Sequence, residues 1–79
     1  PASADPPEEE LERLADRYAQ TTCAQLGQYP DAQGVNAAVA DTMDRSAIPR
    51  ASAQRVVGLA VQNHCPQYLP LVRQVVPDF

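Results

Sequence analysis

Two cysteines and one histidine are the residues of this 79-residue chain whose chemistry stands out, and two of them are adjacent in the run QNHCPQYLPL. A closed zinc site takes about four ligands, so Cys23, His64 and Cys65 do not complete one within a single chain. A reactive thiolate needs a neighbouring cation or a helix N-terminus, whereas Cys65 is expected at a helix C-terminus. His64 points about 100° away from Cys65 around that helix. We therefore predict neither a metal site nor a nucleophile with its base.

The two cysteines are instead expected to bond to each other. They are the one pair available, and 79 residues with a single Phe and no Trp make a thin core. A Cys23–Cys65 disulfide closes a loop of about 43 residues, for which the chain-entropy model gives roughly 4 kcal/mol. If the helices carrying the cysteines lie side by side, the bond requires them to run roughly parallel, with another helix as the return crossing.

Composition argues against several classes of function. Ser46, Ser52 and the carboxylates form no catalytic motif, so we predict that the chain is not an enzyme and uses no cofactor. The net charge is −4 and the six cations are scattered arginines, which makes nucleic acid and anionic membranes poor partners. No segment approaches the roughly 18 apolar residues of a membrane span.

The first residues indicate export. Ala2-Ser3-Ala4 is an A-x-A pattern typical of the end of a signal peptide, although an ordinary linker has the same composition. A secreted or cell-envelope location also suits a disulfide, because such bonds persist in oxidising compartments. We expect residues 1–6 to be the tail left after signal-peptide removal, residues 7–76 to form one domain, and residues 77–79 to be a frayed or docking C-terminal tail.

Apolar residues at helical spacing predict an all-α fold, a small bundle of three main helices plus a short C-terminal helix. The first helix is expected over residues 7–26, with Asp5 as its cap, Pro6 in its first position and Gly27 as its stop. We also expect Glu9 and Arg13 to pair on its wet side.

The later helices follow from turns and apolar stripes. Residues 28–31 form a turn, and Asp31 caps a second helix that ends near Arg45, with Asp41 and Arg45 paired outside. The third helix ends at Cys65, because Pro66 does not continue it. Its apolar face is wide enough for a central helix and consists of Ala53, Val56, Val57, Ala60, Val61 and His64. A short fourth helix is expected over residues 67–75.

The run AVQNHCPQYLPL, with Cys23 upstream and an Ala/Val-rich helix before Cys65 and Pro66, resembles a known family. It is similar to the small exported, largely mycobacterial helical proteins of domain of unknown function family 732. The similarity covers residues 11–72 and rests on Cys23, Val57, Ala60, Val61, Cys65 and Pro66. His64 replaces a frequent tyrosine, and Ile48-Pro49 lacks the usual Ser or Thr cap. The resemblance implies export, a helical fold and paired cysteines, with no known activity.

These observations favour a non-enzymatic secreted or cell-envelope interaction module that binds an unknown protein partner. An alternative is a small carrier that holds an apolar ligand between its helices. The residues that could line its pocket, although their spacing favours plain core, are Tyr18, Met43, Leu59, Leu69 and Phe79. A regulatory or toxin-like role and a subunit of a larger envelope complex remain further alternatives. An internal cavity of a few hundred Å³ would favour the carrier.

Replacing both Cys23 and Cys65 by serine is expected to lower the free energy of unfolding by about 2–5 kcal/mol, because the unfolded chain regains the entropy that the cross-link removes. Urea denaturation of the double variant against the oxidised wild type measures this difference. Free thiols in the folded wild-type protein would contradict the pairing.

Overall fold

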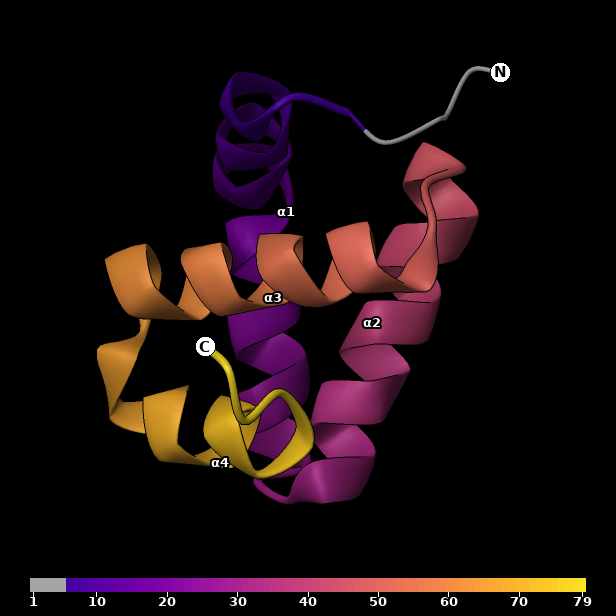
Figure 1. Ribbon diagram of the computed structural model, residues 1–79. Helices are drawn as coiled ribbons and strands as arrows, with labels where there is room; N and C mark the ends of the chain where they lie inside the picture. Colours follow the sequence, from indigo (N-terminus) through magenta and orange to yellow (C-terminus); the bar gives the residue numbers. More distant parts are fainter. Residues whose placement is uncertain (1–5) are drawn as a thin grey trace.

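The computed structural model describes residues 6–79, and these residues form helices and connecting segments without a strand (Figure 1). The predicted all-α class, with three main helices and a short fourth, is confirmed. The elements are α1 (Glu8–Gln28), α2 (Ala32–Ser46), α3 (Arg50–His64), a 3-10 turn η1 (Pro66–Tyr68) and α4 (Leu69–Val75). Asp5, the predicted cap of the first helix, lies outside the described residues.

Both ends of α1 differ from the prediction. The helix begins at Glu8 after Pro7, which has extended backbone and supplies no side-chain cap, so Pro6 precedes the helix instead of opening it. Gly27 lies inside α1 and has no positive φ, so it is not the stop. The helix ends instead where Tyr29 precedes a proline, a position that disfavours helical backbone.

Two ion pairs between neighbouring turns lie on the surface. Arg45 Nε donates to Asp41 Oδ2 at 2.8 Å, as predicted. Arg13 Nη1 pairs with Glu10 Oε1 at 2.9 Å, so the predicted Glu9 partner is wrong by one residue. Residues three and four positions before Arg13 are both within its reach on a helix, and sequence spacing does not separate them.

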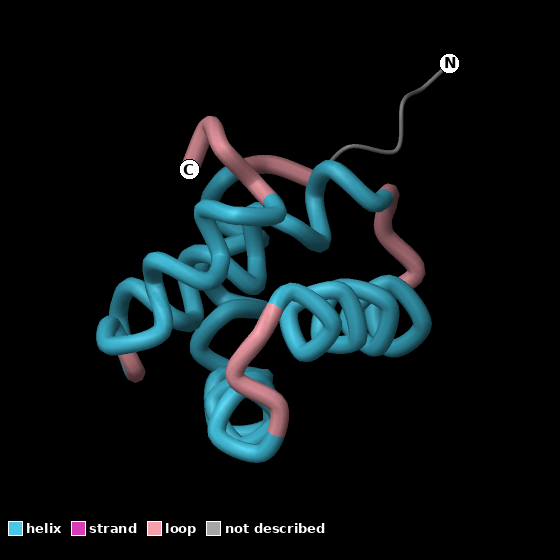
Figure 2. Tube along the Cα trace, turned by 90° about the horizontal axis from the view of Figure 1, so that it is seen from below, coloured by secondary structure: helices cyan, strands magenta, loops and turns pink. Residues whose placement is uncertain are grey.

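Of the three long helices, α3 crosses the other two. In Figure 1, α1 runs down the view, α2 returns beside it, and α3 runs across both. The predicted parallel arrangement of the first and third helices is therefore wrong. A crossing lets α3 cover α1 and α2 together, which its wide apolar arc requires, and α3 packs extensively against both. Figure 2 shows the same crossing from below.

The core has two connected parts that meet on α3. One lies between the first half of α1 and the middle of α3 and contains Leu11, Leu14, Ala15, Ala19, Val56, Leu59 and Ala60. The other joins the end of α1, α2, α3 and α4 and contains Leu26, Val35, Ala38, Val39, Ala53, Val57, Val61, Cys65 and Val72. The whole stretch Val56–Val61 is buried, which confirms α3 as the central helix.

The Cys23–Cys65 disulfide is present, and its Cα atoms are 6.1 Å apart. It joins the second half of α1 to the residue that follows α3, so the crossing of these helices brings both cysteines together without parallel axes. Cys65 is only 4% exposed. The bond therefore secures the point from which the chain turns into η1 and α4.

Ala47, directly after α2, has φ 54° and ψ 44°, the left-handed conformation in which a Cβ is unfavourable. Ala47→Gly is expected to raise the free energy of unfolding by about 1 kcal/mol, measured by urea denaturation. The matched control is Ala24→Gly on the exposed side of α1, which should lower it by about 0.5–1 kcal/mol. Destabilisation by Ala47→Gly would contradict the left-handed geometry.

Candidate functional site

Tyr29, in the turn between α1 and α2, is the large hydrophobic side chain that residues 6–79 leave exposed, at 55% of its area. Tyrosine presents a rigid apolar ring and a polar hydroxyl, and it is enriched at the centres of protein interfaces. The sequence predicts this turn but not the exposure of its tyrosine, because exposure depends on how closely the next helix approaches.

The turn around Tyr29 is held by a set of short local contacts. The Asp31 N–H donates to the Tyr29 carbonyl at 2.9 Å. The Asp31 side chain accepts from the Gly34 N–H at 2.9 Å, which confirms Asp31 as the cap of α2. A Cβ at Gly34 would overlap the Tyr29 carbonyl oxygen, so a glycine is required where the first turn of α2 meets this backbone. Tyr29 therefore projects from a defined support.

A hollow of about 310 Å³ lies beside this tyrosine and is lined by Tyr29, Gln33 and Ala37. The exposed side of α2 continues past it with Asn36 and Ala40. No charged residue occurs from Ala32 through Ala40, although a fifth of the chain is charged. We call Tyr29, Gln33, Asn36, Ala37 and Ala40 the Tyr29 surface. Depletion of charge beside an exposed aromatic ring is typical of the centre of a protein interface.

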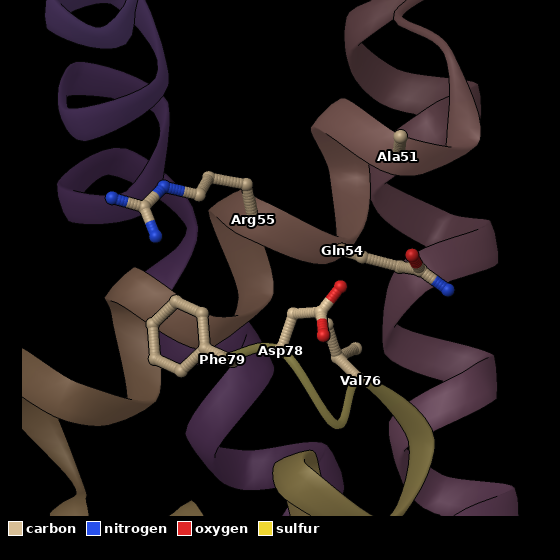
Figure 3. A pocket seen from close by; sticks show the side chains of 6 residues that line it. All are labelled: Ala51, Gln54, Arg55, Val76, Asp78 and Phe79. Carbon is tan, nitrogen blue, oxygen red and sulfur yellow. The ribbon is translucent and has the colours of Figure 1, made fainter.

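A second hollow, of about 220 Å³, lies between α3 and the segment that follows α4 (Figure 3). Its lining residues are Ala51, Gln54, Arg55, Val76, Asp78 and Phe79. Both this hollow and the one beside Tyr29 are open at the surface. Residues 77–79 were predicted to be a frayed or docking tail. In the structure, Phe79 packs against α3.

Arg55 is the charged group at the second hollow with the most contacts. Its Nη2 and Nε donate to Glu8 Oε2 at 2.8 and 3.2 Å, and its guanidinium carbon lies 5.4 Å from the centroid of the Phe79 ring. The hydrogen bonds that Arg55 donates to Glu8 raise the pKa of the guanidinium group and so favour its charged form. The start of α1, the middle of α3 and the end of the described chain meet here.

The five residues predicted to line a carrier's pocket are divided between the two parts of the core. Tyr18 and Leu59 belong to the part between α1 and α3, and Met43 and Leu69 to the part that includes α2 and α4. Phe79 contacts both parts, and of the five it is the one that lines either hollow. Ligand binding by these residues stays a prediction.

His64 does not share the buried face of α3, contrary to the prediction. Its side chain is exposed, and its Nε2 lies 2.9 Å from Asp16 Oδ1 on α1. The helical period alone places it with the apolar residues, but it is the last residue of α3, where the core beneath has ended. An exposed pair of this kind contributes little to stability.

Within residues 6–79, no three His, Cys, Asp or Glu side chains are close enough together to hold a metal ion. None of the helices among these residues has the length and apolar character needed to cross a membrane.

No family model, curated protein or solved structure matches the chain. The resemblance to domain of unknown function family 732 therefore stays a prediction, based on the residues around Cys23 and Cys65.

The Tyr29 turn makes a prediction that distinguishes two glycines. Gly34→Ala is expected to lower the free energy of unfolding by about 1–3 kcal/mol, because the new Cβ displaces the Tyr29 carbonyl. Gly27→Ala is the matched control, since its Cβ would lie 3.4 Å from the Tyr68 hydroxyl, an ordinary contact, and alanine favours the helix by about 0.5–1 kcal/mol. Urea denaturation measures both. Equal effects of the two substitutions would contradict the role assigned to Gly34.

Proposed function

We propose that this protein is a non-enzymatic, secreted or cell-envelope helical module that binds a protein partner through the Tyr29 surface. The observation that carries the proposal is the exposed Tyr29 ring on a well-supported turn, next to an uncharged hollow. An aromatic side chain that is already rigid loses little conformational entropy on binding, so it makes an effective anchor.

The location outside the cytoplasm is supported by two independent features. The described residues contain a disulfide, a bond that persists in oxidising compartments. Residues 2–4 also have the A-x-A composition found at signal-peptide cleavage sites. Membership of domain of unknown function family 732, which the cysteine pattern suggests, would imply the same location.

The shape of the molecule favours a surface function over transport of a ligand. Both hollows are open to solvent, whereas carriers bury most of their ligand in a concave, largely apolar site. All five residues predicted for such a pocket are members of the core or pack against it. An interaction module needs only a rigid support for its contact residues, which the three crossed helices and their disulfide provide.

The proposal predicts that photo-crosslinking from the Tyr29 surface captures one specific protein. A benzophenone amino acid at Ala37, beside Tyr29, is expected to give a discrete adduct after irradiation with native cell-envelope extract from the source organism. The matched control carries the same group at Ala24, which is exposed on α1. The adduct is identified by mass spectrometry.

Two further results decide whether the adduct reports binding through Tyr29. Adding Tyr29→Ala to the Ala37 probe should reduce the adduct at least about tenfold, the loss typical of a hot-spot residue. Circular dichroism should show that this variant remains helical. Equal adducts from the Ala37 and Ala24 probes, or no effect of Tyr29→Ala, would contradict the proposal.

A further inference from the structure

Gly58 occupies the middle of α3, the most buried helix, where glycine is less favourable than alanine. The reason lies in Phe79. A Cβ at Gly58 would come within 2.6 Å of the ring Cδ1 and 2.7 Å of Cζ, closer than carbon atoms approach. The glycine therefore leaves a depression on α3 that a flat ring fills. We call this depression, with the flanking Gln54 and Arg55, the Gly58 notch.

Arg55 is positioned over the ring that fills the notch. Its guanidinium carbon is 5.4 Å from the Phe79 centroid, and in Figure 3 the guanidinium and the ring lie together on one side of the hollow. Two Arg55 nitrogens donate to the Glu8 carboxylate, which orients the guanidinium beside the ring. A cation at this distance from a ring attracts its face, which selects an aromatic over an aliphatic side chain.

The ring in the notch belongs to a segment outside the helices. α4 ends at Val75, and the Phe79 N–H donates to the Val76 carbonyl at 3.0 Å in a single turn. The open hollow beside the ring extends over Gln54 and Asp78, and Figure 3 shows the Asp78 carboxylate directed toward α3. The occupied notch is thus continuous with solvent along one side, and the residue that fills it lies outside the helices.

We infer that the Gly58 notch is a recognition site for an aromatic side chain that follows an acidic residue, on a turn-forming segment of a partner protein. Asp78 and Phe79 occupy the site within the chain and show which chemistry fits it. A partner segment of this type binds by taking the place of residues 77–79. The site is separate from the Tyr29 surface and does not depend on the function proposed for that surface.

The test uses the peptide acetyl-Val-Pro-Asp-Phe-amide, which copies the occupant, and the variant Phe79→Ala, which empties the notch. Peptide titration followed by ¹⁵N NMR is expected to shift the amide signals of Gln54, Arg55 and Gly58. The variant should bind at least about ten times more tightly than the wild type, because the ring within the chain competes for the site. Acetyl-Val-Pro-Asp-Ala-amide, the matched control peptide, should cause no shift in either protein.

A third protein distinguishes specific recognition from non-specific peptide binding. Gly58→Ala fills the notch with a methyl group and should abolish the peptide-induced shifts while α-helical circular dichroism is retained. If Phe79→Ala does not fold, the wild type is titrated at millimolar peptide. The variant Phe79→Leu is then titrated as well. Its side chain has no π face, so Phe79→Leu should bind the peptide more tightly than the wild type does. Absence of shifts in every folded protein, or equal binding of both peptides, would overturn the inference.

Discussion

The covalent bond between Cys23 and Cys65 is the constraint on which the arrangement of this small protein depends. A chain of 79 residues buries too little apolar surface for a wide stability margin. A bond that closes a loop of about 43 residues adds stability because it lowers the conformational entropy of the unfolded chain. The disulfide lies where α3 ends. It therefore secures both the crossing of α3 over α1 and the origin of the segment that packs back through α4.

Around this bond, α3 supplies most of the tertiary organisation. Its residues Val56–Val61 are all buried, because α1 and α2 contact it on one side and the chain after His64 returns to cover another. The two proposed contact regions are attached to this frame in different ways. The Tyr29 surface belongs to the turn that Gly34 and Asp31 support, whereas the Gly58 notch lies on α3 itself. Each region depends on a glycine that permits close approach by another part of the chain.

The elements could be predicted because their signals are local. Helical spacing of apolar residues, the Asp31 cap and the break at Pro66 depend on neighbours within one or two turns, and the structure confirms them. The predicted ion pair and the predicted end of α1 were wrong because two local arrangements of the chain have similar energy. Arg13 reaches Glu10 as easily as Glu9, and α1 continues through Gly27 because a helical glycine is tolerated until the proline after Tyr29 stops the helix.

The sequence by itself determined the helical class, the approximate helix boundaries and the pairing of the only two cysteines. The tertiary structure alone decided that α3 crosses α1, that His64 meets Asp16 in solvent, and that Phe79 fills the space at Gly58. A periodic pattern specifies which face of a helix is buried, but the angle between two helices depends on how whole surfaces fit. Contacts between residues far apart in the chain exist only after that fit is made, and the contact of Phe79 with the Gly58 notch is of this kind.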